Sequence, residues 1–499
     1  MTIVVGIDQG TTNTKAVAVD DAGRLLHTAS RPIVTQAPQP GWVEQDPKQM
    51  LANVVDCVRD VLAAAGESTV AGLGIANQTE TLVVWDRHTG EPVMPAIVWQ
   101  CRRGDEEIRE LRDDRTVALI RAKTGLDLDP TFTACKLKWL FRHRPAIAEG
   151  LRRGDYLFGT VDCWLIWKLT GGAVHATDSS NAARTMLFDI GRLAWDTDLF
   201  ELFGLSIHSL PEVRRSTGPF GATGAALFGR PIPITAALGD QQASLFGHGC
   251  FEPSAIKATY GTGAFIWLNA GNRPDVACCE GLLRTVAWHL EEPCYALEGF
   301  VMYAGAALEW LATRLSIPAG GIGVVERAQQ AGSSGGVILV PAFQGLAGPW
   351  WRPDARAALI GMTESTSVGN ICHAGLEAIC FQVRTLLESI AASTGSKIEL
   401  LRVDGGPTRS AYLMQLQADI LQHPLAVSAF DSVTPYGAAL MAGLGAGLWK
   451  TLDELRAAVP PPALVAPNPA NAMARDKAYR TWRTTTDAIL SLPSDQSSP

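Results

Sequence analysis

The sequence predicts an α/β protein built from two similar halves. Near the N-terminus, strand-like apolar runs alternate with a helix-like segment, which is the pattern of an α/β fold with a mixed sheet. A strand, a Gly/Thr turn and a second strand open the chain, and the same order recurs from Ala255 onwards. The 499 residues also exceed the roughly 250–300 residues that one core can hold, so we expect two large domains.

The first half begins with a hairpin. The apolar run Ile3–Ile7 predicts a strand, and Thr14–Val19, beyond the Gly/Thr turn, predicts its partner. Apolar residues recur at helical spacing over Pro47–Ala65, which predicts a helix with one buried face. Ala71–Ala76 and Leu82–Trp85 return to a strand-like composition. Together these elements favour a mixed sheet covered by a helix.

The second half repeats this opening. Ala255–Tyr260 and Ala264–Leu268 flank a Gly-Thr-Gly turn and predict a second hairpin. We place the domain boundary near Gly249, so that the two domains comprise residues 1–249 and 250–458. The remaining segment, residues 459–499, starts as a Pro-rich arm, continues as a predicted helix over Ala470–Leu490 and ends in a frayed tail.

Composition and charge restrict the class of function. A net charge of −8, a pI near 5.7 and the lack of Lys/Arg blocks argue against a nucleic-acid partner or an anionic membrane surface. No apolar stretch is long enough to span a bilayer, and we expect no signal peptide, because the N-terminus enters a strand pattern at once. The ten cysteines form no CxxC pair, and Cys278 and Cys279 are adjacent, so we expect reduced thiols and a cytoplasmic location.

The first Gly/Thr turn has the residues of a phosphate site. Gly10 permits a close backbone approach, and the N–H and hydroxyl groups of the residues after it, Thr11, Thr12 and Asn13, can hold phosphate. Asp8, just before the turn, can hold Mg²⁺ directly or through water, because Mg²⁺ takes carboxylate oxygens beside substrate phosphates. The alternative is a plain hairpin in which Gly and Thr serve only the geometry of the turn.

A second turn and an aspartate extend this hypothesis. Thr262 and Gly263 offer another phosphate loop, and two such hairpins facing each other form a clamp on a nucleotide triphosphate. Asp240 follows the apolar run Ile234–Leu238 and can accept the proton of an attacking hydroxyl group. Its alternative role is an N-cap for a helix that begins at Gln241.

A third glycine cluster follows another strand-like segment. Gly405 and Gly406 come after Glu399–Val403 and Asp404. In the nucleotide clamp they lie under the adenosine, and in the alternative they form an ordinary strand-to-helix turn.

These motifs stand in the order seen in FGGY carbohydrate kinases. The motifs that carry the resemblance are Asp8-Gln9-Gly10-Thr11-Thr12, Gly239-Asp240-Gln241-Gln242, Tyr260-Gly261-Thr262-Gly263 and Asp404-Gly405-Gly406. Within that family the chain most resembles glycerol kinases, and the matching stretches are residues 40–44, 96–103, 158–168, 183–188 and 341–343. The resemblance runs from residue 3 to about residue 455.

The resemblance implies an actin-like fold of two ribonuclease-H-like domains, with MgATP between them and a polyol deeper in the cleft. It places the polyol and the catalytic base in the first domain and the nucleotide in the second. The residues it assigns are Asp240 as base and, with Asp8, as metal ligand; Thr79, Glu80, Trp99, Thr131, Gln241 and Phe265 in the substrate pocket; and Gly10, Thr11, Thr12, Asn13, Lys15, Thr262, Gly263, Gly305, Gly405 and Gly406 at the nucleotide.

The sequence departs from glycerol kinases at several of these positions. Thr79 stands where they usually have Arg, and Thr131 where they usually have Tyr. Lys15 replaces a usual Arg, while Glu309 and Ala411 stand where Gln and Asn are common at the nucleotide. The first two departures bear on the identity of the substrate, because the missing side chains line the glycerol site.

We therefore expect an ATP- and Mg²⁺-dependent kinase of a four- or five-carbon polyol or sugar, such as erythritol. A glycerol kinase is the alternative. A third alternative is a non-catalytic sugar-binding relative, which is disfavoured because Asp8 and Asp240 are both present. A fourth is an actin- or chaperone-like ATPase with a protein partner, which Glu80 and Trp99 disfavour. We also expect a homo-oligomer, either a dimer or a tetramer.

Overall fold

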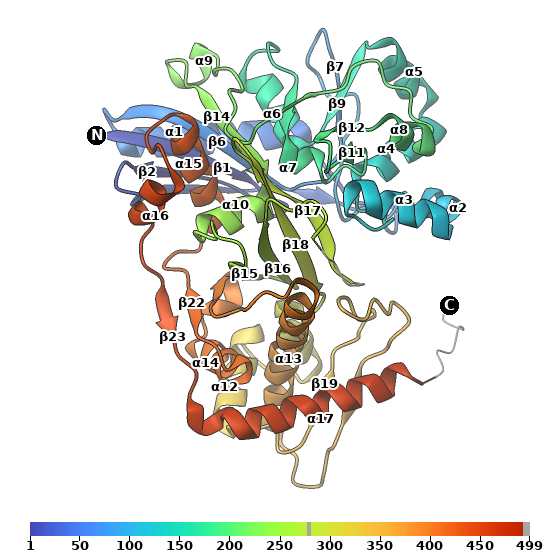
Figure 1. Cartoon of the computed structure of the whole chain (residues 1–499), viewed down its shortest axis with the longest axis vertical. Coiled ribbons are helices and arrows are strands. Elements are labelled where there is room, and N and C mark those ends of the chain that lie inside the picture. The colour runs from blue at the N-terminus through green and yellow to red at the C-terminus, as the bar shows by residue number, and fades with distance from the viewer. Residues whose placement is uncertain (277–280, 493–499) are drawn as a thin grey trace.

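The computed structural model describes residues 1–276 and 281–492, and it contains two large sheets with one strand order (Figure 1). The first sheet has the order β3-β2-β1-β6-β14. Its strands are β1 (Thr2–Gln9), β2 (Asn13–Asp20), β3 (Leu25–Pro32), β6 (Thr69–Asn77) and β14 (Ile234–Gly239). The first three strands run antiparallel, and β6 and β14 are parallel to β1.

The second sheet repeats this arrangement in the order β18-β16-β15-β21-β22, extended by β17 beyond β18 and by β23 beyond β22. Its strands are β15 (Ile256–Tyr260), β16 (Ala264–Gly271), β17 (Leu283–His289), β18 (Pro293–Val301), β21 (Leu401–Asp404), β22 (Leu425–Val427) and β23 (Ala463–Val465). Both predicted hairpins and the duplication of the fold are thus confirmed. The order of two antiparallel partners and two parallel neighbours is the same in each half.

Local sequence signals set the limits of the helices that cover these sheets. Helix α1 (Pro47–Ala65) begins after Asp46, whose side chain accepts from the N–H of Lys48, and it ends at Gly66 with a positive φ. The long helix α13 (Val368–Thr394) begins with a capping box of Ser367 and Asn370. These signals explain why the predicted bounds of α1 agree with the structure.

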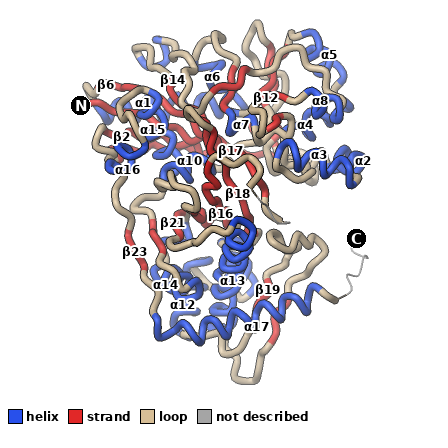
Figure 2. The backbone as a smooth tube through the Cα atoms, in the orientation of Figure 1, coloured by secondary structure: helices blue, strands red, loops and turns tan. Residues whose placement is uncertain are grey.

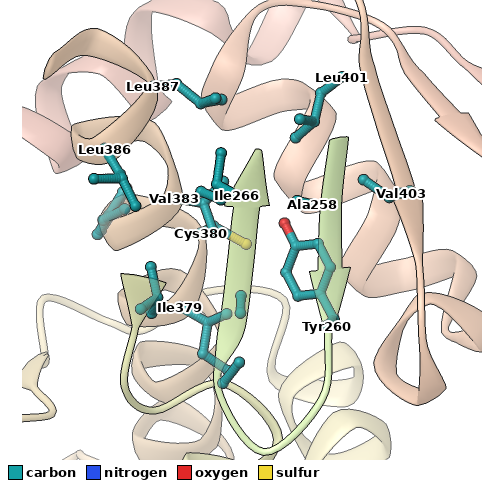
Figure 3. Close-up of a cluster of buried hydrophobic side chains, with 14 of the residues drawn as sticks. Ala258, Tyr260, Ile266, Ile379, Cys380, Val383, Leu386, Leu387, Leu401 and Val403 are labelled. Carbon is teal, nitrogen blue, oxygen red and sulfur yellow. The ribbon is translucent and has the colours of Figure 1, made fainter. Parts of the chain in front are cut away.

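Helix α13 covers one face of the second sheet, as the backbone tube in Figure 2 shows. Figure 3 shows the core between them, in which Ile379 and Val383 of α13 meet Ile266 of β16 and Leu401 of β21. Burying a side chain of this size stabilises the fold by about 1.5–3 kcal/mol. Because side chains alternate along a strand, β15 turns Ala258 toward this core and its odd-numbered residues toward the opposite face.

That opposite face packs on helix α10 (Asp240–Gly247) and so meets the first half of the molecule. Helix α15 (Val433–Gly445) lies in sequence between β22 and β23 of the second sheet but packs on β1, β6 and β14 of the first, where Figure 1 shows it among the blue strands. The backbones of β1 and α15 are in close contact, because a Cβ atom on Gly6 would lie 1.9 Å from the carbonyl oxygen of Pro435. The boundary near Gly249 stays a prediction.

Most remaining helices lie between β7 (Val83–Asp86) and β14, or in the second half. The first group is α2 (Asp105–Leu111), α3 (Asp114–Thr124), α4 (Thr133–His143), α5 (Pro145–Arg153), α6 (Val161–Leu169), α7 (Ser179–Ala182), α8 (Thr197–Phe203) and α9 (Ala225–Phe228). The second is α11 (Gly305–Arg314), α12 (Gly320–Ala331), α14 (Ala411–Leu421), α16 (Leu452–Ala458) and α17 (Ala472–Leu490).

The C-terminal segment is more ordered than its composition suggests. The predicted Pro-rich arm contributes β23, which pairs antiparallel with β22, and α17 follows it. The eight described cysteines are free thiols, whereas Cys278 and Cys279 lie outside the described residues, as does most of the expected tail. Among the described residues, no helix has the length and apolarity needed to cross a membrane.

Candidate active site

Asp240 opens α10, directly after the buried strand β14. Its Oδ1 accepts from the N–H of Gln241 at 2.7 Å, while Gly239 occupies the N-cap position. The alternative role of Asp240 as an N-cap is therefore wrong. Burial and the nearby charges of Asp8 and Glu80 raise the pKa of Asp240 to about 7, which suits a group that takes a proton near neutral pH.

Asp8 lies at the end of β1, opposite Lys15 in the first hairpin. Burial raises its pKa to about 7, and the charge of Lys15 limits the rise. Its buried Oδ1 has no hydrogen-bond partner among the described residues. An unpartnered buried carboxylate oxygen is unfavourable unless a ligand satisfies it, so this atom fits a cation ligand.

The fit of a magnesium ion rests on these two carboxylates. Mg²⁺ is usually held by one or two carboxylates together with substrate phosphates and waters, not by a cage of protein ligands. In the described part of the chain, no three His, Cys, Asp or Glu side chains form a group that could hold a metal ion by themselves. Asp8 and Asp240, which interact electrostatically, thus suit a Mg²⁺ that arrives with a nucleotide.

One backbone hydrogen bond and two side chains support the first turn. The N–H of Gly10 donates to the carbonyl oxygen of Asn13 at 3.1 Å, and Thr11 and the exposed Thr12 lie between them. Two side chains hold Thr11: Gln45 donates to its carbonyl oxygen at 2.7 Å and Trp99 Nε1 to its hydroxyl at 2.8 Å. Trp99, predicted in the substrate pocket, therefore also contacts the predicted phosphate turn.

The second turn is held between two glycines that the sequence also singled out. The N–H of Gly305 donates to the carbonyl oxygen of Gly261 at 2.9 Å, and the carbonyl of Thr262 accepts two further N–H groups at the start of α11. On the other side, Gly405 has a φ of +102°, and a Cβ atom there would lie 2.0 Å from the carbonyl oxygen of Tyr260. The structure thus brings these predicted nucleotide residues together.

We expect Gly405→Ala to destabilise the protein and Gly406→Ala to leave its stability unchanged. The first substitution meets backbone at 2.0 Å with an unfavourable φ, whereas a Cβ atom on Gly406 meets nothing within 4 Å. Thermal unfolding of both variants measures the difference, with an expected loss of about 2 kcal/mol or more for Gly405→Ala alone. Equal melting temperatures would contradict the tight seating of the turn.

Lys257, which the sequence reasoning missed, links the base to the second half. It is fully buried on β15, and its Nζ donates to Gln241 Oε1 at 2.5 Å and to Thr259 Oγ1 at 2.8 Å. Thr259 in turn donates to Asp404 at the end of β21 at 2.6 Å. Because Lys257 engages the amide oxygen of Gln241 and no described residue accepts from its NH₂ group, that group can donate to a ligand.

Glu80 is held in a strained conformation. Its φ is +64°, which is uncommon outside glycine, and its side chain is buried. Thr79 Oγ1 donates to Glu80 Oε2 at 2.7 Å, and Arg184 Nε donates to Oε1 at 2.6 Å. The carbonyl oxygen accepts from Thr133 at 3.1 Å. Several groups therefore fix a carboxylate that the sequence placed in the substrate pocket.

Thr131 lies in the loop that precedes α4, two residues before Thr133, whose hydroxyl donates to the carbonyl oxygen of Glu80. Its hydroxyl donates to Asp129 at 2.6 Å, and its carbonyl oxygen accepts from the buried Lys136. Burial lowers the pKa of Lys136 to about 8. The hydroxyls of Thr79 and Thr131 thus already have acceptors within the protein, which leaves each of them only as an acceptor for a substrate hydroxyl.

Phe265 reaches the site from β16 in the second half. Its ring packs on Phe300 of β18 with centroids 4.6 Å apart, and Phe265 pairs in register with Thr259 on one side and with Phe300 on the other. Directly paired residues share one face of a sheet. Phe265 therefore lies on the same face as Lys257, which is the face turned toward α10.

Both halves of the chain match one protein family. The N-terminal domain of the FGGY family of carbohydrate kinases matches residues 3–247, and the C-terminal domain of that family matches residues 256–446. Glycerol kinase of Citrifermentans bemidjiense is 44% identical over 455 residues, covering 90% of this chain and 92% of that protein. Glycerol kinase 2 of Thermotoga maritima is 40% identical over 486 residues, covering 97% and 98%.

A solved structure agrees with these sequence matches. The crystal structure of Plasmodium falciparum glycerol kinase with ADP has a TM-score of 0.91 and 32% sequence identity, and the match covers 99% of both chains. The two sheets, the two Gly/Thr turns and Asp240 therefore occur in a chain that aligns with kinases over nearly its full length. The protein belongs to the FGGY family of carbohydrate kinases.

Proposed function

We propose that this kinase transfers the terminal phosphoryl group of ATP, bound with Mg²⁺, to a hydroxyl of a four- or five-carbon polyol or sugar such as erythritol. The observation that carries the choice of substrate is a pair of short side chains. The hydroxyl of Thr79 donates to the carboxylate of Glu80, and Thr131 lies two residues before Thr133, which donates to the carbonyl oxygen of Glu80. Short side chains at both positions favour a longer acceptor than glycerol.

In this proposal Asp240 accepts the proton of the attacking hydroxyl, since its pKa lies near 7. The turns at Thr11 and Thr262 hold the phosphates through backbone N–H and hydroxyl groups, and the free NH₂ of Gln241 donates to the acceptor. Mg²⁺, when bound by Asp8 and Asp240, supplies neutralisation of the charge on the phosphate oxygens.

Unmade hydrogen bonds distinguish a short acceptor from a longer one in this pocket. A polyol too short for the pocket leaves polar groups unpaired or bound only to water, and an unmade buried hydrogen bond costs about 1–3 kcal/mol. Since the hydroxyls of Thr79 and Thr131 retain only acceptor capacity, the additional substrate hydroxyl must donate to them. A fourth or fifth carbon that carries a hydroxyl group meets this requirement.

Glycerol is the second candidate, and a specific observation favours it. Proteins named glycerol kinase are 40–44% identical to this chain over nine tenths or more of its length. In that case neighbouring side chains fill the space left at Thr79 and Thr131.

We expect kcat/KM for erythritol or a pentitol to exceed that for glycerol by about tenfold, as is usual when one carbon unit distinguishes two substrates. Side-by-side steady-state assays with glycerol, tetritols, pentitols and ketopentoses measure this ratio. The double variant Thr79→Arg/Thr131→Tyr restores the glycerol-kinase side chains and should shift the ratio toward glycerol. Wild-type kcat/KM for glycerol equal to or above that for every longer acceptor would contradict the proposed substrate.

We expect no inhibition by millimolar fructose 1,6-bisphosphate. The segment around Arg230, which corresponds to the sugar-bisphosphate loop of some bacterial glycerol kinases, is short, and Arg230 donates to the backbone carbonyl of Ser68 at 3.0 Å. One exposed Arg that already has a backbone partner is a poor site for two phosphates. Steady-state rates with and without the bisphosphate test this, and clear inhibition would refute it.

The cytoplasmic location and the homo-oligomeric state also remain part of the proposal. Free thiols at all eight described cysteines are compatible with a reducing compartment. Sedimentation of the purified protein distinguishes a monomer from the expected dimer or tetramer.

A further inference from the structure

Arg184 joins the two halves of the molecule at the candidate substrate pocket. It follows α7, and its side chain is 7% exposed. Nε donates to Glu80 Oε1 of the first half at 2.6 Å, and Nη1 donates to Glu298 Oε2 on β18 of the second half at 2.7 Å. One guanidinium group therefore binds two buried carboxylates that are 218 positions apart in the chain.

Aromatic rings enclose the same guanidinium group from both halves. Its carbon lies 5.4 Å from the ring centroid of Phe132 and 5.8 Å from that of Trp267. Glu298 pairs in register with Trp267, so both belong to the face of the second sheet that carries Lys257. Arg184 is thus fixed by one carboxylate and one ring from each half, which leaves its guanidinium group little freedom to move.

The two carboxyl groups of Glu80 and Glu298 share one guanidinium group. All three side chains lie in a buried environment, because those of Glu80, Arg184 and Glu298 are 6%, 7% and 7% exposed. Buried carboxylates require hydrogen-bond donors around their oxygens. Glu80 Oε1 accepts one hydrogen bond from Arg184, and Oε2 accepts one from Thr79. Each of these carboxylate oxygens can accept a second hydrogen bond. A neutral ligand with hydroxyl donors satisfies those positions.

We propose that Arg184, fixed by Glu298, is a positioning residue that orients the carboxylate of Glu80 to accept a hydroxyl of the polyol, so that acceptor specificity depends on both halves of the molecule. The planar fork of Arg184 sets the plane of the Glu80 carboxylate, and the positive φ of Glu80 sets its direction. Glu298 holds the other side of the fork. This inference rests on the proposed function, because it takes the acceptor to be a polyol.

This chain has a particular need for such a residue. With Thr79 at the neighbouring position, the cation that binds the Glu80 carboxylate directly in the described part of the chain is Arg184, from 104 positions further along. Lys136, also buried in this region, donates instead to the carbonyl oxygens of Pro130 and Thr131. We therefore expect the loss of Arg184 to change acceptor binding and to leave nucleotide binding unchanged.

The test compares variants of the full-length protein with the acceptor that the wild type phosphorylates best. Arg184→Met should raise the KM for the acceptor about 10- to 100-fold, the usual effect of losing a charged hydrogen bond, with the KM for ATP within threefold of wild type. Arg184→Lys should recover part of the loss, since it keeps the charge but not the fork. Glu298→Gln, which keeps Arg184, should give an intermediate KM for the acceptor.

Arg384→Met is the matched control. Arg384 also bridges two carboxylates, each at 2.8 Å, but it belongs to α13 and binds Glu388 of the same helix and Asp476 of α17. The Arg384→Met substitution should lower the melting temperature without changing the KM for the acceptor. A second readout is the rise in melting temperature that the acceptor causes, which should be lost in Arg184→Met and retained in Arg384→Met.

Several results would overturn the inference. If Arg184→Met and Glu298→Gln lower the melting temperature but leave both KM values unchanged, or raise the two KM values in parallel, Arg184 has only a structural role. If Arg184→Met does not fold, Arg184→Lys and Glu298→Gln decide the question: the KM for the acceptor should rise while the KM for ATP stays near that of the wild type. A wild-type enzyme that phosphorylates no polyol or sugar contradicts the proposed function itself, and this inference with it.

Discussion

Asp240→Asn is expected to lower turnover by about 10²- to 10⁴-fold, the usual contribution of general-base catalysis. The amide has the shape of the carboxylate but cannot accept the proton of the attacking hydroxyl. The contact with the N–H of Gln241 at 2.7 Å can persist through the amide oxygen, so the start of α10 should be unchanged. Steady-state kinetics with saturating ATP and acceptor measure the loss.

The control for this variant is its fold and its nucleotide affinity. The melting temperature should stay near that of the wild type, and calorimetry should show a similar affinity for ADP without Mg²⁺. Turnover within threefold of wild type would show that Asp240 is not the base, and the remaining buried carboxylates near the site would need the same test.

Asp8→Ala is expected to lower turnover by about 100-fold or more at millimolar Mg²⁺, because a metal that neutralises phosphate charge is worth several kcal/mol in the transition state. The buried, unpartnered Oδ1 of Asp8 is the atom that this change removes. Raising the Mg²⁺ concentration should restore part of the activity, while the KM for the acceptor changes little. Titration of the rate with Mg²⁺ measures both effects.

Asp21→Ala is the matched control, because Asp21 is exposed and directly follows β2, the strand of the same hairpin that pairs with β1. It should leave the dependence on Mg²⁺ unchanged. An Asp8→Ala enzyme with normal dependence on Mg²⁺ but weakened acceptor binding would place Asp8 with the polyol instead of the metal.

The sequence was sufficient for the two hairpins because their signals are local. Each consists of two apolar runs around a turn of Gly and Thr, and these patterns fix strand, turn and strand within about twenty residues. The bounds of α1 were predicted for the same reason, since Asp46, Pro47 and Gly66 mark its ends in the sequence. Asp8 and Asp240 were identifiable because each ends an apolar run.

The contacts that complete the site were not predictable, because they join residues far apart in the chain. Lys257 lies within an apparently ordinary strand, and only the folded chain, in which Thr259 of β15 also meets Ser244 of α10, places its Nζ on Gln241. The bond between Arg184 and Glu298 likewise depends on how the two halves meet. No local sequence pattern predicts that two residues so far apart in the chain form a hydrogen bond.

Long-range packing also explains the elements that composition described poorly. The Pro-rich arm forms β23 because β22 offers an unpaired edge, which the arm covers. Helix α15 lies on the first sheet because Gly6 and Gly74 leave room for its backbone, although more than 350 residues separate it from either glycine. A glycine in a strand indicates a close approach of another backbone, but it does not identify the helix that makes the contact.

The most direct test of the account is whether turnover of ATP requires a polyol or sugar and yields its phosphomonoester. Phosphorus NMR of a reaction with MgATP and the best acceptor should show one phosphomonoester formed for each ADP, with little ADP formed when the acceptor is absent. ADP and inorganic phosphate at the same rate with or without any acceptor would contradict the account and indicate an ATPase instead of a carbohydrate kinase.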